Sequence, residues 1–468
     1  MKRLVIGCGL AAVVAAVGLG AGPVWTGAVA ERQHERALEF LEREPQVRVL
    51  SSEYDRGYRG ATSRVEVELL GSAADDFAAF MEQEYGVRQA PVLVFHDGVS
   101  HGPIPSGSGG VPGAAFVTSR VEVADAIGAH LPLFAGDPTL MTAETRVGFD
   151  GASRMTFATP AWEVEGDEAA FSFTGLEGTL SLDADMASGE IDMGFDQLVL
   201  SEFGSTWSAR GVRLQAAPEN LGAHIWTGDS VLEVDTVGVD DSEIEGLRIV
   251  SGAELDDGAL DVTFDATMHG AVAGGYRIEE SRLKAALYRV DQHAMEQLVA
   301  LGDDLELGHI DEHTMGLRFL GLIPQLLERE PEFVIEEFTI GMPEGPFRAS
   351  ARLAWEGQTP SLEDAFAAIN GLAAEVEMKA PRDAVHRSLR AYLRHDLETD
   401  AATYGQNLSG QELDERAVEL ADARVEAMVA EGVLQHQGQD LQGHLLIEDG
   451  LVLINGRNYG PVWALLAR

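Results

Sequence analysis

Alternating apolar and polar residues dominate the first two thirds of the chain. Residues 64–69, RVEVEL, alternate strictly, which is the period of a half-buried strand. With the preceding segment they predict a hairpin whose turn uses Gly57 and Gly60. Further strands are expected at residues 90–96, APVLVFH, and at residues 116–123, FVTSRVEV, on either side of a glycine-rich loop.

From about residue 140 to about residue 290, short alternating segments such as SRMTFATP, AAFSFTGLEG and ALDVTFDATMHG are separated by Gly, Asp and Ser. Such segments are typical of antiparallel strands that have one face in solvent. They show no strict repeat length, so neither a propeller nor a solenoid is indicated.

Helical spacing of apolar residues begins near Tyr288. Helices are expected in DQHAMEQLVALG, EHTMGLRFLGLIPQLLERE and PRDAVHRSLRAYLRHDLE, with strands at EFVIEEFTIGM and FRASARLAWEG between them. The last element is a hairpin, GHLLIEDGLVLING, in which Asp449 and Gly450 form a two-residue turn.

The clearest helix is predicted between Ser409 and Gly432. Ser409 and Glu412 form a capping box at its start, and Gly432 ends it. Four apolar residues are expected to line one face of this helix: Leu413, Leu420, Val425 and Met428.

The N-terminal segment carries the longest apolar run. After Lys2 and Arg3 it is uncharged from Leu4 to Ala30, which exceeds the about 20 residues that a helix needs to cross a bilayer. The positive flank stays cytoplasmic, so the rest of the chain is expected in the periplasm. The small residues before Glu31 also fit a signal-peptidase site, so cleavage after Ala30 stays open as an alternative to a retained anchor.

Together these elements predict an α+β fold: a mostly antiparallel, curved β-sheet body with helices in the C-terminal third, preceded by one N-terminal transmembrane helix. We divide the chain into an anchor or uncleaved signal at 1–30, an α+β segment at 31–135, a β-rich region at 136–290 and an α+β region at 291–468.

The net charge of the chain limits the classes of function that it can have. The 468 residues include 77 Asp and Glu against 33 Lys and Arg, a net charge of −44, and only Lys2, Lys284 and Lys379 are lysines. Nucleic-acid binding through a basic face is excluded because phosphate contacts need clustered bases. Such an acidic surface suits a salt-adapted host. The single cysteine, Cys8, allows neither an intrachain disulfide nor a cysteine metal site.

The segment FHDGVSHGPIP contains His96, Asp97 and His101. One interpretation is a metal cluster, or a general base at His101. The other is structural: Asp97 and Gly98 form a turn after the strand, and His101 hydrogen-bonds the backbone where the loop leaves it. We favour the structural interpretation, because no third ligand or positioned nucleophile lies nearby in the sequence.

A second candidate is His309, Glu312 and His313, which match the inverted zinc-protease motif H-x-x-E-H. Asp311 has the form of a helix cap, however, which would place His309 outside the helix. Residues 183–190, DADMASGE, begin like a calcium loop but lack the required Gly and Glu, so a hairpin turn is expected.

A group of basic residues falls on one predicted helix. A solvated face paired with the chain's own carboxylates is expected there, with lipid headgroups or an acidic partner as the alternative. The group comprises Arg382, His386, Arg387, Arg390, Arg394 and His395.

Several motifs occur in the order typical of one family. They are VWTG at the end of the anchor, YDRG (Tyr54, Arg56, Gly57) and SHGPIP (His101, Gly102, Pro103). In this order the chain resembles the YdgA-like bacterial envelope proteins, the domain of unknown function family 945. The resemblance implies a single-span inner-membrane protein facing the periplasm, and it transfers no catalytic residue. The extreme acidity and the glycine-rich stretch after Pro105 depart from the family pattern.

We therefore expect a non-enzymatic, membrane-anchored periplasmic envelope protein that binds a lipid or another hydrophobic ligand in an apolar groove. One alternative is a structural or assembly factor that acts through protein contacts, including self-association. The other is a zinc hydrolase that uses His309, Glu312 and His313. No cofactor and no catalytic or metal-ligating residue is assigned, and the six family-motif residues are expected to be structural or binding residues.

Overall fold

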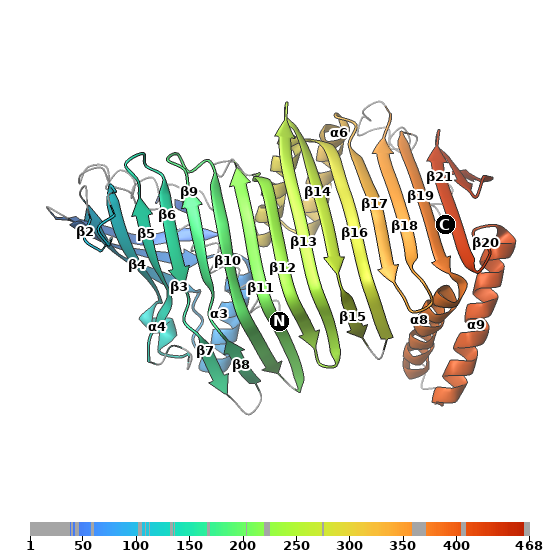
Figure 1. Ribbon diagram of the computed structural model, residues 1–468, viewed down its shortest axis with the longest axis horizontal. Helices are drawn as coiled ribbons and strands as arrows, with labels where there is room; N and C mark the ends of the chain where they lie inside the picture. The colour runs from blue at the N-terminus through green and yellow to red at the C-terminus, as the bar shows by residue number, and fades with distance from the viewer. Residues whose placement is uncertain are drawn as a thin grey trace. The chain divides into compact units, whose positions relative to one another are not determined.

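A computed structural model describes most of the chain after residue 45, and Figure 1 gives its course. The described residues are 38, 41–42, 46–57, 60–101, 105–107, 109–111, 113–131, 134, 136–165, 169–202, 204–219, 225–273, 276–357, 371–403 and 409–462. The predicted anchor at 1–30 lies outside them. Within them, no helix is both long enough and apolar enough to cross a membrane.

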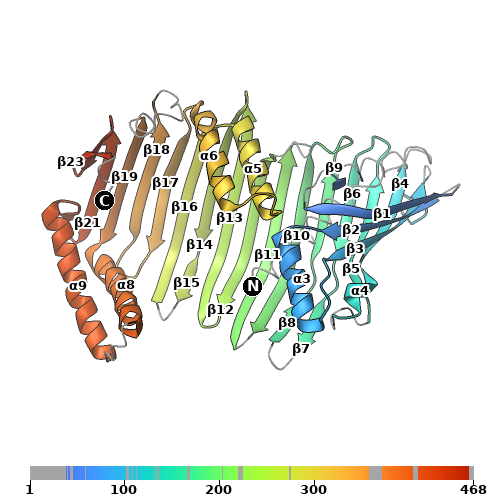
Figure 2. The ribbon, with the colours of Figure 1, turned by 180° about the vertical axis from the view of Figure 1, so that it is seen from behind.

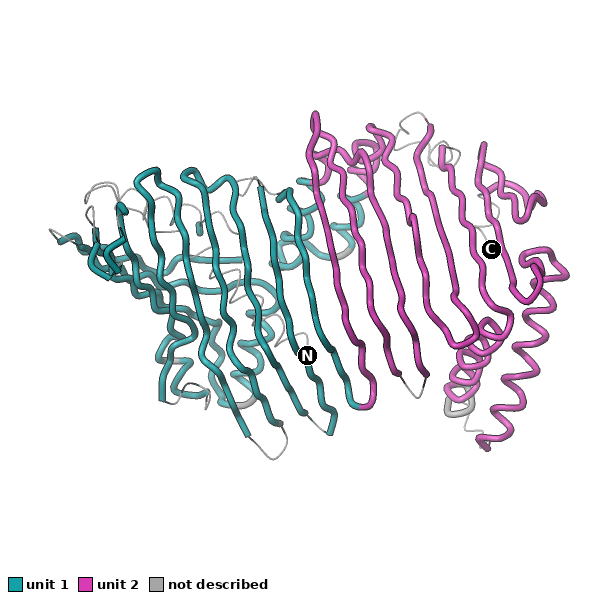
Figure 3. Tube along the Cα trace, in the orientation of Figure 1, with its two compact units in different colours: residues 1–240, 296–319 teal, residues 241–295, 320–468 magenta. Residues whose placement is uncertain are grey.

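The chain forms two compact units, coloured separately in Figure 3. Unit 1 contains residues 1–240 and 296–319, and unit 2 contains residues 241–295 and 320–468. Each unit is built on antiparallel strands, so the predicted α+β class with a large antiparallel sheet is confirmed.

The strands of unit 1 pair in the order β1-β2-β3-β4-β5-β6-β9-β10-β11-β12. Strand β9 pairs with the first half of β10, and β8 pairs with the second half of the same strand. Strand β7 pairs with β8. The bounds are β1 Val47–Arg56, β2 Gly60–Leu69, β3 Val92–His101, β4 Ala115–Val123, β5 Thr139–Val147, β6 Ser153–Ala158, β7 Trp162–Glu165, β8 Ala169–Phe173, β9 Glu177–Leu182, β10 Gly189–Glu202, β11 Ser205–Glu219 and β12 Thr227–Val239.

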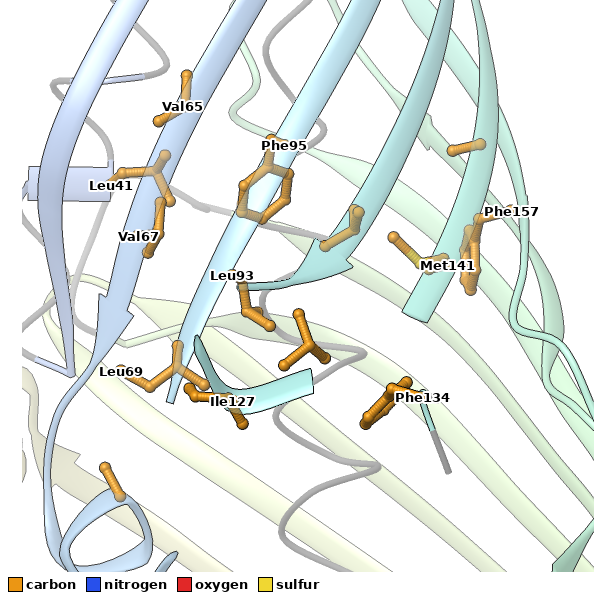
Figure 4. Close-up of a cluster of buried hydrophobic side chains, with 14 of the residues drawn as sticks. Leu41, Val65, Val67, Leu69, Leu93, Phe95, Ile127, Phe134, Met141 and Phe157 are labelled. Atoms are coloured by element: carbon orange, nitrogen blue, oxygen red, sulfur yellow. The ribbon is translucent and has the colours of Figure 1, made fainter. Parts of the chain in front are cut away.

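One face of this sheet, which we call the inner face, carries the core of unit 1 (Figure 4). On β2 and β5, every second residue is buried and the intervening ones, apart from Gly60 and Leu140, are polar, as the alternation predicts. Helices α3 (Ser72–Tyr85) and α4 (Asp125–Gly128) add Met81 and Ile127 to the same cluster. The inner face of β2–β6 and β9 therefore carries a buried hydrophobic core.

Helix α3 was not predicted from the sequence. Its buried residues Ala74, Ala78 and Met81 follow helical spacing, and Gly86 ends it in the left-handed region at φ 73°. Helices are therefore not confined to the C-terminal third, which corrects the finer part of the predicted fold.

The strands of unit 2 pair in the order β13-β14-β16-β17-β18-β19-β21-β22-β23, with short β15 between β13 and β16 and short β20 on β21. The bounds are β13 Ser242–Asp256, β14 Ala259–Met268, β15 Gly270–Ala273, β16 Tyr276–Asp291, β17 Glu332–Gly341, β18 Phe347–Trp355, β19 Leu372–Pro381, β20 Gln435–Gln437, β21 Asp440–Glu448, β22 Leu451–Ile454 and β23 Arg457–Pro461.

The remaining helices follow β16 and β19. They are α5 Gln292–Glu306, α6 Glu312–Leu327, α8 Arg382–Thr403 and α9 Gly410–Glu431. The predicted capping box of α9 is present, since the Glu412 amide donates to Ser409 Oγ and the Ser409 amide donates to the Glu412 carboxylate. Leu413 and Val425 are buried as predicted, but Leu420 is 45% exposed, and Ala417 and Ala421 take its place on the buried face.

The predicted turn at Asp97 and Gly98 is wrong. Strand β3 continues through both residues to His101 and pairs with β2 on one side and β4 on the other. Two flanking strands satisfy the backbone of this segment, which outweighs the local turn preference of an Asp-Gly pair. The hairpin turns at Gly57 and Gly60, at residues 183–188 and at Asp449 and Gly450 are confirmed.

Candidate functional site

Unit 2 carries an unusually uniform apolar surface on one face of its sheet. Residues opposite one another in the strand register form continuous rows, for example Ala253–Val262–Leu287–Phe333–Leu353–Ala374–Ile447–Val452. We call this surface the apolar face. Its members are Ile249, Ser251, Ala253, Leu255, Leu260, Val262, Phe264, Ala266, Leu283, Ala285, Leu287, Val290, Phe333, Ile335, Phe338, Ala349, Ala351, Leu353, Trp355, Leu372, Ala374, Val376, Met378, Leu445, Ile447, Val452 and Ile454.

The chemistry of the apolar face is nearly free of polar groups. Its hydroxyl-bearing residues among the described ones are Ser251 and, in the adjoining row Met268–Ser281–Ile340–Phe347, Ser281; no charged side chain belongs to it. The rings of Phe338 and Phe347 meet edge to face with centroids 5.7 Å apart, so aromatic groups lie beside the aliphatic ones. A surface of this kind offers dispersion contacts and almost no hydrogen bonds.

The middle of the apolar face is incompletely covered. Phe333 is 39% exposed, Leu353 is 42% exposed and Leu255 is 38% exposed, although each lies in a row of apolar residues. Helices α8 and α9 pack near Met378 and Leu441 at one corner, on the side of β19 and β21 (Figure 2). The inner face of β2–β6 and β9 is buried, whereas part of the apolar face of unit 2 meets solvent.

The opposite face of the same sheet is charged and ion-paired. Arg282 pairs with Asp265, Lys284 with Glu336, and Arg352 with Glu332. Hydrogen bonding to Asp265 raises the pKa of Arg282, and hydrogen bonding from Arg352 lowers the pKa of Glu332. This face is therefore suited to water, and the contrast between the two faces makes the sheet of unit 2 amphipathic.

The charged face also holds a group that could bind a metal. Glu375 and Glu377 lie on β19, His444 lies opposite Glu377 on β21, and their ligand atoms are all within 4.8 Å of one another. His444 Nε2 lies 3.1 Å from Glu375 Oε1, a contact that an exposed ion pair explains. No other such group occurs among the described residues.

In unit 1, a polar row interrupts the hydrophobic inner face. Asp97 lies directly between Ser63 and Ser119 in the strand register. Burial raises the pKa of Asp97, while the hydroxyls of Ser119 and Ser63 and the charge of His96 act in the opposite direction. His96 itself points to the other face, where its Nε2 lies 3.4 Å from Glu122. Asp97 and His96 therefore do not form a joint metal site with His101.

Tyr54 of the YDRG motif and His101 of the SHGPIP motif lie at one end of the inner face. Tyr54 packs against Ala115 and Val147, and His101 lies directly opposite Ala115 in the register. Arg56 ends β1, and the Gly57 amide donates to the Gly60 carbonyl at 2.8 Å. His101 Nε2 is buried and has no hydrogen-bond partner among the described residues, so the predicted backbone contact is not made by that atom. Gly102 and Pro103 lie outside the described residues.

The zinc-motif histidines do not share a helix. Helix α6 begins at Glu312, and Asp311 caps it by accepting a 2.7 Å hydrogen bond from the Thr314 amide. His309 lies before the cap, 3.5 Å from Asp304, while His313 is exposed on the first turn of the helix. The arrangement of two histidines one helical turn apart, which the motif requires, is absent here.

The basic residues of α8 are largely paired with carboxylates, as expected. His386 contacts Asp422, Arg387 contacts Glu344, and Arg394 contacts both Glu398 and Asp414. At residues 183–188, Asp183 accepts hydrogen bonds from the amides of Ala187 and Ser188 and closes a hairpin turn. Contacts with carboxylates therefore account for the basic residues of α8, and a hairpin turn accounts for residues 183–188.

Comparison with known proteins gives one match. The model of a family of bacterial proteins of unknown function, DUF945, matches residues 1–460. No curated protein and no solved structure matches the chain. Because the matched segment spans nearly the whole sequence, the chain belongs to the DUF945 family, which the order of the YDRG and SHGPIP motifs had indicated.

Proposed function

We propose that this protein is a non-enzymatic, membrane-anchored envelope protein whose unit 2 binds the acyl chains of a lipid on its apolar face. The observation that carries the proposal is the half-exposed row around Phe333 and Leu353. Covering such groups releases water and contributes about 0.8 kcal/mol for each buried methylene of a ligand. The predicted anchor at residues 1–30 supports the proposal, because it would hold unit 2 close to a membrane.

The polarity of the apolar face favours an acyl chain over a protein partner. Protein interfaces carry about one hydrogen bond per 100–200 Å². The apolar face has only the hydroxyls of Ser251 and Ser281 among its described residues and would leave the polar groups of a protein partner unpaired. An acyl chain has no such groups to satisfy. An extended acyl chain can lie along an apolar row that crosses several neighbouring strands.

The test is lipid analysis of the full chain purified from envelope extracts. Leu353→Glu places a carboxylate in the exposed part of the apolar face and is expected to reduce co-purified lipid about tenfold, since a buried charge is costly. Val334→Glu is the matched control, because Val334 pairs with Arg352 on the charged face. Equal lipid content in the wild type and in both variants would contradict the proposal.

An assembly role through protein contacts is the second candidate, and the same exposed row favours it, since exposed apolar patches also mark protein interfaces. The two candidates differ in what Leu353→Glu removes. Loss of an oligomer in native mass spectrometry, with no lipid bound to the wild type, supports the assembly role. Loss of bound lipid without a change of oligomeric state supports lipid binding.

A further inference from the structure

The glycine-rich loop after the SHGPIP motif folds back over the outer face of unit 1, the face opposite its core. The Ser106 amide donates to Ser100 Oγ at 2.9 Å, and the two hydroxyls lie 2.9 Å apart. Gly107 has φ +90°, and a Cβ there would lie 2.8 Å from the ring of Phe116. Glycine is therefore required where the loop presses on the sheet. This explains a stretch of sequence that departs from the family pattern.

Beneath this loop lies a cavity of about 350 Å³, within the size range of small-molecule sites. Pro105, Val111 and Gly113 of the loop form one side of it, and the ends of β5, β6 and β9 form the other. Val111 is an exposed apolar residue of its lining. The cavity belongs entirely to unit 1, so it is independent of the apolar face of unit 2.

Two arginines line the same cavity. Arg146 on β5 and Arg154 on β6 are direct cross-strand partners, and both are exposed. Neither has an ion pair or a hydrogen bond with any described residue. Several other arginines of the described sheets, by contrast, are paired with carboxylates, among them Arg120, Arg282 and Arg352.

Placing two guanidinium groups opposite each other destabilises a sheet, since like charges directly across a strand pair repel. The single carboxylate in the lining, Asp150, accepts a hydrogen bond from the Ala152 amide inside its own turn. Ser181 lies next in the register beyond Arg154 and adds a hydroxyl to the lining. The site therefore has donors and positive charge with no acidic group committed to them.

We propose that this cavity binds a small organic anion, with its carboxylate or phosphate held by Arg146 and Arg154 and its short apolar body against Val111 of the loop. An oxyanion neutralises the two facing guanidinium groups and accepts their hydrogen bonds. Pro105, Val111 and Gly113 form the wall on the side of the apolar body. This binding site is separate from the proposed lipid site in unit 2.

The test is calorimetric titration of the full chain, held in nanodiscs of zwitterionic lipid, at low ionic strength. Octanoate and octyl phosphate are the probes, octanol and inorganic phosphate are the partial ligands, and empty nanodiscs give the background. Octanoate, octyl phosphate or both are expected to bind at least tenfold more tightly than either partial ligand, and the preferred probe identifies the anionic group. Octanol binding as tightly as both probes would overturn the role of the arginines.

Arg146→Gln and Arg154→Gln are each expected to weaken the binding of the preferred probe by about tenfold or more. Neither is expected to lower the unfolding temperature, because each removes a repulsion. Arg88→Gln is the control, since Arg88 is exposed and paired with Glu82. Val111→Glu, at a residue 48% exposed, adds a negative charge to the lining and is expected to weaken binding similarly. Unchanged affinity in both arginine variants would refute the proposal.

Discussion

At the scale of single residues, Asp97 is an ionisable group of unit 1 whose pKa is raised by burial. It lies in the middle of β3 on the inner face, and the two serines beside it in the register do not fully replace water. The net effect is a raised pKa, with burial as the main cause. Its neutral form is therefore favoured by folding.

A pH dependence of stability follows from this raised pKa. Because the folded state binds the proton more tightly than the unfolded state, Asp97 favours folding below its unfolded pKa of about 3.9. That contribution is lost as pH rises through the higher folded pKa. Asp97→Asn is expected to increase the free energy of unfolding at pH 7 by on the order of 1–3 kcal/mol. Urea unfolding between pH 4 and pH 8 measures it.

Asp55→Asn is the control for this prediction. Because Asp55 is exposed on β1, this substitution is expected to change the free energy of unfolding little. Destabilisation by Asp97→Asn at neutral pH would mean that the ionised carboxylate makes stabilising contacts, contrary to the burial argument.

At this scale, features that depend on neighbours in the sequence were predicted correctly, and features that depend on residues distant in the sequence were not. The capping box at Ser409 and Glu412 involves neighbours in sequence, and it was identified correctly. Asp97 and Gly98 resembled a turn because their neighbours on β2 and β4 are distant in sequence. Nothing within the segment FHDGVSHGPIP reveals Ser63 or Ser119. The arginine pair at Arg146 and Arg154 was missed for the same reason.

At the scale of elements, helix α9 depends on its first turn. Ser409 accepts the Glu412 amide and so satisfies one of the donors that a helix leaves free at its start. Ser409→Ala is expected to lower the free energy of unfolding by about 1 kcal/mol. Chemical denaturation measures the loss. The control is Gln411→Ala, two residues after Ser409 and exposed. An equal effect in both variants would contradict a specific role of the cap.

Strands were easier to predict from the sequence than helices in the first part of the chain. Period-two alternation identified β2, β4, β17 and β18 because each has one apolar and one polar face. Helix α3 was overlooked since its buried positions are mostly alanines, which carry a weak apolar signal. Alternation also could not tell which apolar face would be covered by helices and which would stay exposed.

At the scale of the whole molecule, the net charge of −44 is the dominant property. Ion pairs such as Arg282–Asp265 offset only a small part of it, since acidic residues outnumber basic ones more than twofold. Repulsion among the remaining carboxylates destabilises the folded state at low ionic strength.

Salt is therefore expected to raise the unfolding temperature. Going from 0.05 M to 1 M sodium chloride shortens the screening length from more than 10 Å to about 3 Å, which weakens repulsion across the surface. Differential scanning calorimetry is the measurement, with an expected rise of several degrees. A fall in the unfolding temperature would show that screened ion pairs contribute more than the repulsion that salt removes.

The central claim at this scale is that the apolar face of unit 2 contacts acyl chains. A photo-crosslinking amino acid at Leu353, activated in intact cells, tests it most directly, with the same amino acid at Val334 on the charged face as the control. We expect lipid adducts, identified by mass spectrometry, at residue 353 and none at residue 334. Protein adducts without lipid at residue 353, or equal lipid labelling at both residues, would contradict the account.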